Sequence, residues 1–301
     1  MLSVLIPVYN FNASHLIETL CYQAMELEKP FEIIVIDDAS SESYRKLNRK
    51  VKSLEGVTYI EEPKNLGRSK IRNKLADIAS FDNLLYLDCD SEITNDNFIR
   101  NYMAQVNEDG VIYGGREYVH DVPQDTRYKL HWLHGVYREE IPVKIRSSEP
   151  NKSFMTNNFM ISRNAFNKVR FNEKIRGYGH EDTLFGYDLA KCHIDIKHID
   201  NPVIHLGLES SEEFLRKTRE GIKNLKRIMK INGNEKRLSK DITLLSYYKK
   251  LRTCGMESLF RYVYDRFEMR LRKNLMSDNP NLIVFDLYKL GYLCSLNGDM
   301  N

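Results

Sequence analysis

The sequence predicts an α/β protein with a mainly parallel sheet, helices on both faces and a helical extension at the C-terminus. Three observations support this fold class. Apolar strand-like runs alternate with amphipathic helical patterns through residues 1–208, as in parallel sheets built with right-handed crossovers. Polar residues follow the ends of several of these runs, which is typical of the ligand-binding edge of an open sheet. From residue 209 onward the pattern is helical throughout.

Buried strands and helices alternate through the first half of the chain. The strands are short and apolar, as expected for strands covered on both faces. The helices carry apolar residues at intervals of three and four, and Ile71, Leu75 and Ile78 are expected to turn inward in the third helix. In order, we expect a strand at 2–7, a helix at 13–29, a strand at 31–36, a helix at 42–54, a strand at 57–61 and a helix that begins near residue 67.

The next strand, over residues 83–87, ends in Asp88-Cys89-Asp90. Side chains two residues apart on an extended chain point the same way, so the two carboxylates can face one ligand. Their mutual repulsion calls for a cation or several hydrogen-bond donors. A Mg or Mn ion shared with a diphosphate is one interpretation, and a surface turn of the same composition is the other. Cys89 is interpreted as a small core residue.

The second half of the chain begins with a strand at 111–115. The pattern is irregular over residues 116–150, where we expect a flap that binds an acceptor, with a short helix over 127–138. The remaining elements are expected to be a strand within 154–161, a helix from 163, a helix that ends near 191, and closing strands at 193–199 and 203–205.

Composition and motifs exclude several classes of protein. The 301 residues are 42% hydrophobic, which is enough for a large core. No apolar window approaches the ~18 residues of a membrane helix, and Pro7 and Asn10 interrupt the N-terminal run before it could act as a signal peptide, so we expect a cytosolic protein. Five cysteines without paired spacing indicate reduced thiols. Neither a Gly-x-Gly-x-x-Gly after the first strand nor a Gly-Lys-Ser/Thr is present, which disfavours dinucleotide and P-loop sites.

The C-terminal extension is basic. Residues 209–301 hold 19 Lys and Arg against 12 Asp and Glu, a net charge of +7, which leaves −4 for the rest of the chain. In one interpretation its aromatic residues hold it on an anionic membrane leaflet. In the other, which we favour, they pack the helices onto the rest of the protein and the charges face water. These aromatic residues are Tyr247, Tyr248, Phe260, Tyr262, Tyr264 and Phe267. Helix breaks are expected near 232–234 and 279–280.

Five motifs in a fixed order resemble the inverting glycosyltransferases of family 2, which have the GT-A fold. The motifs are Ile6-Pro7-Val8-Tyr9-Asn10, Ile36-Asp37-Asp38-Ala39-Ser40, Asn65-Leu66-Gly67 with Ile71-Arg72-Asn73, Leu87-Asp88-Cys89-Asp90 and Gly177-Tyr178-Gly179-His180-Glu181-Asp182. The resemblance implies a GT-A catalytic domain over 1–208, with a nucleotide-sugar half (1–115) and an acceptor half (116–208). The helical extension occupies 209–301.

The resemblance also implies how the donor is bound. It assigns the uracil and ribose site to Pro7, Tyr9, Asp37 and Asp38. Arg68 and Arg72 would reach the base or the diphosphate, since guanidinium groups suit phosphate oxygens; a solvated helix face is the alternative. Asp88 would bond the ribose or sugar hydroxyls. Asp90 would ligate a divalent Mn or Mg ion, and His205 is either a second metal ligand or a structural histidine.

The same resemblance implies that Glu181 and Asp182 carry the catalysis. Asp182 would be the base that takes the acceptor proton, while Glu181 holds acceptor or donor hydroxyls. Acids that stabilise the first turn of a helix are the alternative explanation for this pair. Tyr178 would stack on a sugar. Lesser candidates are Asn157 and Asn158, which a turn between strands explains equally well, and His180, His120, His131 and His134.

These expectations combine into one functional hypothesis. The chain would be a metal-dependent inverting glycosyltransferase that moves a hexose or N-acetylhexosamine from a UDP-sugar to a glycan or glycolipid hydroxyl in surface polysaccharide synthesis. One alternative is a nucleotidyltransferase, although no Gly-rich, Lys-containing loop follows the first strand. Another is a catalytically silent nucleotide-sugar or glycan binder, which Asp90 and Asp182 argue against. A nucleic-acid binder is disfavoured because no recognition module is present. Donor sugar, acceptor, linkage and oligomeric state are not predicted.

Overall fold

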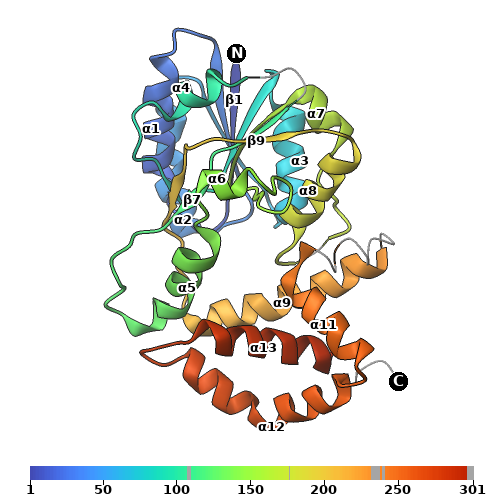
Figure 1. Cartoon of the computed structure of the whole chain (residues 1–301). Helices are drawn as coiled ribbons and strands as arrows, with labels where there is room; N and C mark the ends of the chain where they lie inside the picture. Colours follow the sequence, from blue (N-terminus) through green and yellow to red (C-terminus); the bar gives the residue numbers. More distant parts are fainter. Residues whose placement is uncertain (107–109, 176, 232–237, 239–240, 297–301) are drawn as a thin grey trace. The chain divides into compact units, whose positions relative to one another are not determined.

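A computed structural model describes residues 1–106, 110–175, 177–231, 238 and 241–296 of the chain (Figure 1). The chain divides into two compact units. We call the first the sheet unit; it contains Met1–Val119, Glu139–Lys174 and Glu181–Gly207. We call the second the helical unit; it contains His120–Arg138, Ile175–His180 and the described part of Leu208–Asn301. The domain boundaries expected at residues 115 and 208 stay predictions.

A seven-stranded sheet forms the centre of the sheet unit, with the order β3-β2-β1-β4-β8-β6-β9. Pairing is parallel from β3 through β4 and between β6 and β9, while β8 runs antiparallel to both of its neighbours. The predicted mainly parallel sheet is therefore confirmed. The strands are β1 (Leu2–Val8), β2 (Phe31–Asp37), β3 (Val57–Glu61), β4 (Asn83–Leu87), β6 (Val111–Tyr113), β8 (Asn158–Ser162) and β9 (Ile196–His198).

Two hydrophobic cores cover the two faces of this sheet. Alternate residues of β4 show the division, because Leu85 and Leu87 join one core and Leu84 and Tyr86 join the other. The first core is completed by α1 (Ser14–Met25) and α4 (Phe98–Met103), and the second by α3 (Arg68–Ile78), α7 (Arg163–Lys168) and α8 (Glu181–Lys191). Figure 1 shows these two sets of helices on opposite sides of the sheet. β4 is thus buried on both faces, as its apolar run predicted.

The first half of the chain differs from the prediction in two helix boundaries and in the exposure of one residue. The first helix ends at Met25 rather than near residue 29. The helix expected over 42–54 is α2 (Glu42–Asn48) followed by a 3₁₀ turn, η1 (Arg49–Ser53). Ile78, expected to turn inward, is 39% exposed because α3 ends at this residue.

A second, three-stranded sheet joins segments that are far apart in the sequence. Its order is β5 (Ser91–Glu92), β10 (Val203–His205) and β7 (Arg116–Glu117). In its register His205 pairs with Ser91, directly after the Asp88-Cys89-Asp90 segment. The closing strand at 203–205 therefore exists, but it belongs to this small sheet and not to the main one.

Asn158 fastens the start of β8 to neighbouring loops. Its amide nitrogen donates to the carbonyl oxygens of Gly115 (3.0 Å) and Asn201 (2.9 Å), and its side-chain oxygen accepts from the Tyr102 hydroxyl (2.7 Å). The side chain is fully buried. Both the oxygen and the nitrogen of the Asn158 side-chain amide are therefore bonded to other parts of the protein.

We expect Asn158→Ala to lower the free energy of unfolding by about 2–4 kcal/mol, because each buried polar group left unsatisfied costs about 1–3 kcal/mol. Urea denaturation of both proteins measures the difference. The exposed Asn167 of α7 serves as a control, and Asn167→Ala is expected to lower stability by less than about 0.5 kcal/mol. If Asn158→Ala lowers the free energy of unfolding by less than about 1 kcal/mol, these hydrogen bonds contribute little to stability.

The irregular region after β7 contains short helical segments. The helix expected over 127–138 is divided into a 3₁₀ turn, η2 (Thr126–Tyr128), α5 (Lys129–His134) and a π-helical turn, η3 (Gly135–Glu139). A further short helix, α6 (Val143–Arg146), follows in the sheet unit. Whether the region is an acceptor-binding flap stays a prediction.

The helical unit has its own core. Its main helices are α9 (Ser211–Ile231), α11 (Thr243–Thr253), α12 (Glu257–Leu275) and α13 (Leu282–Ser295). The core contains Leu130, Phe214, Leu215, Tyr264, Leu275, Phe285 and Tyr288. The predicted break at 279–280 lies between α12 and α13. The one expected at 232–234 lies outside the described residues.

The aromatic residues of the extension have two different environments. Tyr248 and Tyr264 are buried, as packing requires. Tyr247, Tyr262 and Phe267 are exposed, and Phe260 is half-buried. Packing within this unit therefore accounts for only some of these rings. Among the described helices, none combines the length and apolar character that a bilayer span requires.

Candidate active site

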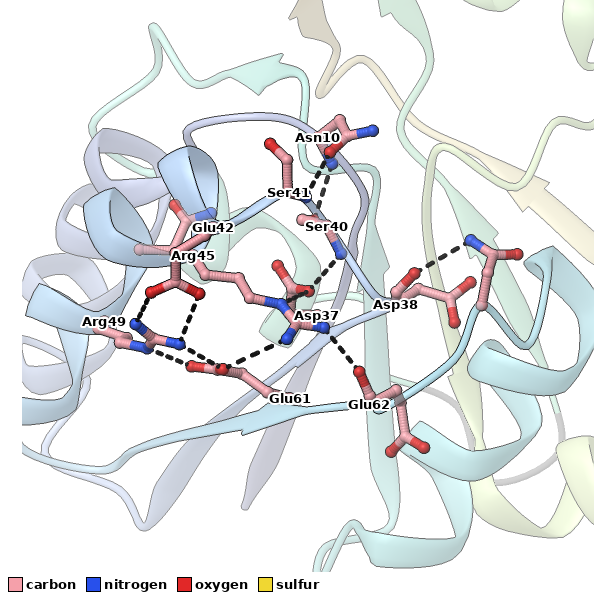
Figure 2. Close-up of polar contacts among 12 residues, drawn as sticks. Asn10, Asp37, Asp38, Ser40, Ser41, Glu42, Arg45, Arg49, Glu61 and Glu62 are labelled. Carbon is pink, nitrogen blue, oxygen red and sulfur yellow. Dashed lines mark hydrogen bonds and ion pairs between the residues drawn. The ribbon is translucent and has the colours of Figure 1, made fainter.

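Hydrogen bonds tie together the loops that follow β1 and β2 (Figure 2). The Asn10 amide donates to Ser40 Oγ, and the Ser41 amide donates to Asn10 Oδ1, both over 2.8 Å. Asn10 and Ala39 have φ values of 50° and 64°, the left-handed region that a turn this tight requires. The two loops are thus joined to each other at the carboxyl edge of the sheet.

The Asp37 carboxylate is bonded to neighbouring residues at this edge. It is fully buried, and its Oδ1 accepts from the Ser40 amide (2.8 Å) and from Arg45 Nε (3.2 Å). Its Oδ2 accepts from the Tyr59 hydroxyl (3.3 Å). Figure 2 shows Arg45 reaching on to the Glu62 carbonyl oxygen, 2.7 Å away. Asp37 therefore organises the end of β2 through its own neighbours.

Asp38 fixes the start of α3. Its two carboxylate oxygens accept from the amides of Leu66 (2.6 Å) and Gly67 (3.0 Å). Burial raises the pKa of Asp38 despite these two bonds. Gly67 has a φ of 82°, which a side chain would strain. Asp38 thereby sets the direction of the helix that carries Arg68 and Arg72.

Pro7 and Tyr9 lie at the same edge. Pro7 is half-buried within β1, next to Ile36 of β2. Tyr9, in the loop after β1, is 55% exposed, so much of its side chain is accessible. A ring in this state can stack on a base.

Arg72 bridges two acidic groups. Its Nη2 lies 2.7 Å from Asp88 Oδ1 and its Nη1 lies 3.8 Å from Glu181 Oε1. Arg68 Nη1 donates to the same Glu181 oxygen over 2.8 Å. Arg72 is buried, whereas the Arg68 side chain is about half exposed. The alternative of a solvated helix face therefore does not apply to Arg72.

Arg116 belongs to the same cluster, although the sequence did not indicate it. Its Nη2 lies 3.8 Å from Asp88 Oδ2, and its Nη1 donates to Glu139 Oε2 over 2.8 Å. Asp88 is thus flanked by two guanidinium groups. Arg116 is the third residue after the end of β6, in a region without a regular pattern. Only the pairing of β7 with β10 brings it here, and that pairing has no sequence signal.

Asp90 and His205 form a second part of the site. Asp90 Oδ1 lies 3.5 Å from His205 Nδ1, and the Leu206 amide donates to the Asp90 carbonyl oxygen over 2.8 Å. A Cβ at Gly207 would overlap Asp90 Oδ2, so any larger residue there would displace the Asp90 carboxylate. Burial alone would raise the pKa of Asp90. The nearby His205 and Arg116 have the larger, opposite effect and hold the pKa of Asp90 well below its usual range. Asp90 therefore stays ionised.

This donor set fits a divalent metal that a substrate completes. No three His, Cys, Asp or Glu side chains among the described residues are grouped to hold a metal by themselves. Mg²⁺ is commonly bound by one or two carboxylates together with substrate phosphates and water, so a full protein cage is not required. Asp90 Oδ1 is buried, and beside its ion-pair contact with His205 it has no partner that meets hydrogen-bond geometry in the described structure. A carboxylate oxygen in this state is a ready metal ligand.

Glu181 and Asp182 occupy the first turn of α8 and differ in charge state. Burial opposes the charge of Glu181, but Arg68 and Arg72 outweigh it and lower its pKa. Burial and the neighbouring Glu181 charge raise the pKa of Asp182 to about 6. Asp182 Oδ1 also accepts from the Thr183 amide over 2.6 Å. The pair thus contains one fixed anion and one carboxylate that titrates near neutrality.

Buried polar atoms without partners concentrate around these groups. None of them has a hydrogen-bond partner within the described part of the chain. Because an unpaired buried polar atom costs free energy, such a concentration indicates a polar ligand with both donors and acceptors. The six atoms are Arg72 Nε and Nη1, Arg116 Nε, Asn157 Nδ2, Asp90 Oδ1 and Glu181 Oε2.

Of the lesser candidates, Asn157 contributes its Nδ2 atom to this group, and the others lie elsewhere or have other partners. Asn158 is occupied within the fold, as described above. His120, His131, His134 and His180 belong to the helical unit. His131 stacks on Phe214 with ring centroids 4.4 Å apart and accepts from the Glu209 amide over 2.9 Å, so its environment is structural.

Tyr178 also belongs to the helical unit. Lys217 Nζ lies 5.2 Å from the centre of its ring, and the Asn224 amide donates to its carbonyl oxygen over 2.9 Å. Gly177, Gly179 and His180 around it have positive φ values of 86°, 91° and 67°. The segment before Glu181 is thus a defined turn, held by α9.

Two solved structures share the fold of the chain. A mannosyltransferase from Pyrobaculum calidifontis in complex with GDP-Man and Mn²⁺ is 12% identical, with a TM-score of 0.59, over 100% of this chain and 88% of that one. A glucosyl-3-phosphoglycerate synthase from Mycobacterium tuberculosis, in complex with Mn²⁺, UDP and glucosyl-3-phosphoglycerate, is 16% identical with a TM-score of 0.51. That match covers 75% of this chain and 78% of the other.

Sequence comparison finds relatives among polysaccharide synthases. A hyaluronan synthase of Pasteurella multocida is 26% identical over 231 residues, and a chondroitin synthase of P. multocida strain Pm70 is 25% identical over 221. These matches cover 66% and 62% of this chain but only 24% and 23% of the relatives. The chain thus spans about a quarter of their length.

A family model adds the decisive match. The model for glycosyl transferase family 2 matches residues 3–175, more than half of the chain. Its range contains the loops after β1, β2 and β4 and the start of α3, which carry most of the cluster described above. The chain therefore belongs to glycosyl transferase family 2 and has the GT-A fold.

Proposed function

We propose that the chain transfers a sugar from a UDP-sugar to the hydroxyl of a glycan or lipid-linked glycan, with inversion and with the help of a divalent metal. The observation that carries this proposal is the set of six buried atoms around Asp88, Asp90 and Glu181 that lack a hydrogen-bond partner in the described structure. A nucleoside diphosphate sugar offers phosphate oxygens to the arginine donors and hydroxyl groups to the carboxylates. A protein without such a ligand would leave these atoms unsatisfied.

Arg72 and Arg116 would bind the donor diphosphate, and the metal site would bind it as well. Both guanidinium groups already flank Asp88, so their unpartnered Nε atoms are fixed in place for a ligand. Asp88 would bond ribose or sugar hydroxyls, while Tyr9 and the Asp37–Asp38 loop would form the wall of the base site. Asp90 and His205 would hold Mn²⁺ or Mg²⁺, and a metal ion held there would supply a Lewis acid against the charge of the departing UDP.

Asp182 would act as the general base. Its carboxylate would take the proton of the acceptor hydroxyl as that oxygen attacks the anomeric carbon opposite UDP, which inverts the configuration in one displacement. Glu181 stays ionised in its pair with Arg68 and Arg72, so it is suited to holding hydroxyls and not to accepting a proton. The two acids would thus have separate roles.

The acceptor class is proposed from the curated relatives. Their names describe synthases of hyaluronan and chondroitin, which are polysaccharides. By this similarity we propose that the transfer belongs to polysaccharide synthesis. We further propose that the sugar is a hexose or N-acetylhexosamine.

UDP release tests this proposal. The full chain is incubated with a panel of UDP-sugars and glycan acceptors, with Mn²⁺ or Mg²⁺ and again after chelation. We expect one donor to turn over, and chelation to stop the reaction. UDP binding without turnover of any donor on any acceptor would favour the silent binder. Turnover that persists after chelation would contradict metal dependence.

Activity should depend on pH through Asp182. Because the base must be ionised, we expect kcat/KM to fall about tenfold for each pH unit below about 6 and to level off above it. The groups that face Asp182 are Glu181, Arg68, Arg72 and the Thr183 amide. Glu181→Gln removes the nearest negative charge, so it should move this limb of the profile to lower pH. A kcat/KM that is flat between pH 5 and 7 would argue against Asp182 as the base.

A further inference from the structure

The outward side of α12 combines large apolar residues with cations. Tyr264 and Leu275 of this helix are buried in the core of the helical unit, and Leu271 is packed against that core. The residues that recur at helical spacing on the opposite side are exposed. We call them the α12 outer face: Leu259, Tyr262, Val263, Arg266, Met269, Arg270 and Lys273.

The apolar members of the α12 outer face are strongly exposed. Leu259 is 57%, Tyr262 69%, Val263 44% and Met269 77% accessible. Scattered exposed apolar residues are common, but four of them on one face of one helix form a patch. Such a patch calls for a partner that removes it from water.

The charged members of the α12 outer face are all positive. Arg266, Arg270 and Lys273 are exposed, and no acidic residue lies among them. Two of the three acids of α12 have partners away from this face: Glu268 pairs with Arg219, and Glu257 accepts from the Tyr248 hydroxyl. Asp265 lies at the edge of the face. No ion pair of Arg266 or Lys273 occurs within the described structure, and Arg270 lies over the Phe267 ring, 5.3 Å from its centre.

We propose that the α12 outer face binds an anionic lipid surface, with its apolar side chains in the headgroup region and its cations on lipid phosphates. Helices that lie in a membrane interface carry this mixture of Tyr, Leu and Met with Lys and Arg. An anionic glycan would pair with the cations but would leave the apolar side chains exposed to water. The net charge of +7 on residues 209–301 would also attract an anionic lipid surface.

Vesicle binding by the full chain tests this inference. The protein is sedimented with phosphatidylcholine vesicles that contain about a third phosphatidylglycerol, and with pure phosphatidylcholine vesicles. We expect binding only to the anionic vesicles and a loss of binding in high salt, because salt screens the attraction. The triple variant Arg266→Gln, Arg270→Gln, Lys273→Gln should bind about 100-fold more weakly, since each cation near such a surface contributes roughly fivefold.

Two further variants make the test specific. Tyr262→Ser with Met269→Ser keeps the charge and should also weaken binding. Lys29→Gln, Lys46→Gln, Lys50→Gln removes three exposed cations from the sheet unit and should bind as the parent does. Equal loss in this control would mean general charge attraction and would overturn the proposal.

Other occupants of the face give different results. If a second copy covers it, sedimentation will show a dimer that the Tyr262→Ser, Met269→Ser variant dissociates, with no vesicle binding by the parent, and the proposal fails. If only soluble anionic polymers compete for the face and vesicles do not bind, it fails as well. The substituted side chains are exposed, so each variant should keep the circular dichroism and UDP release of the parent. Loss of vesicle binding is thereby distinguished from failure of the transferase proposal.

Discussion

Asp182→Asn is expected to lower kcat by about 10²–10⁴-fold, the usual contribution of a positioned general base. The amide is nearly isosteric, so the first turn of α8 should persist, but it cannot take a proton. Affinity for UDP should change by less than about twofold, because Asp182 is assigned to the acceptor hydroxyl and not to the nucleotide. Initial rates of UDP release and titration with UDP measure the two quantities.

Asp188 provides the matched control for this substitution. It lies on the same helix and pairs with Lys191 over 3.6 Å. Asp188→Asn should leave kcat within about twofold of the parent. If Asp182→Asn keeps more than about a tenth of the activity, Asp182 is not the base. If UDP binding is lost along with activity, Asp182 belongs to the donor site or supports its structure.

Asp90→Ala is expected to lower kcat/KM by at least about 100-fold, since a Lewis acid at the leaving group is worth several kcal/mol. The variant should also lose tight Mn²⁺ binding in the presence of UDP. The signal of free Mn²⁺ in electron paramagnetic resonance reports this binding without reference to activity. His205→Ala should weaken the same binding by a smaller amount.

Asp96, an exposed acid a few residues further along the chain, is the control. Asp96→Asn should bind Mn²⁺ and turn over as the parent does. If Asp90→Ala keeps full Mn²⁺ binding with UDP present, the metal lies elsewhere. If binding is lost but turnover remains, the reaction does not need the metal.

The sheet was predictable where its strands are strongly apolar. β4 is buried on both faces because four consecutive residues, Leu84 to Leu87, are large and apolar. Its abrupt end at Asp88 placed two acids at the sheet edge. The antiparallel direction of β8 was not predictable, because an apolar run has the same composition in either direction. Likewise, residues 49–53 continue a helical pattern, yet the structure winds them as a 3₁₀ turn.

Site residues that lie in local sequence motifs were predictable, but the contacts between distant segments were not. Asp90 and His205 were named from separate segments, and their 3.5 Å approach follows from the pairing of β5 with β10. Arg116 was missed because the same small sheet places it, through two-residue strands that have no pattern of their own. The burial of Arg72 was also invisible, since a charged residue on a helix is ordinarily solvated.

Equilibrium titration of the full chain with UDP, with and without Mn²⁺, tests the central claim most directly. The account predicts that UDP binds at the cluster around Asp88, that Mn²⁺ tightens binding by at least about tenfold, and that Asp90→Ala removes this enhancement. GDP should be titrated in parallel, because one structural neighbour holds GDP-Man, and UDP should bind more tightly. No binding of UDP under any of these conditions would contradict the account.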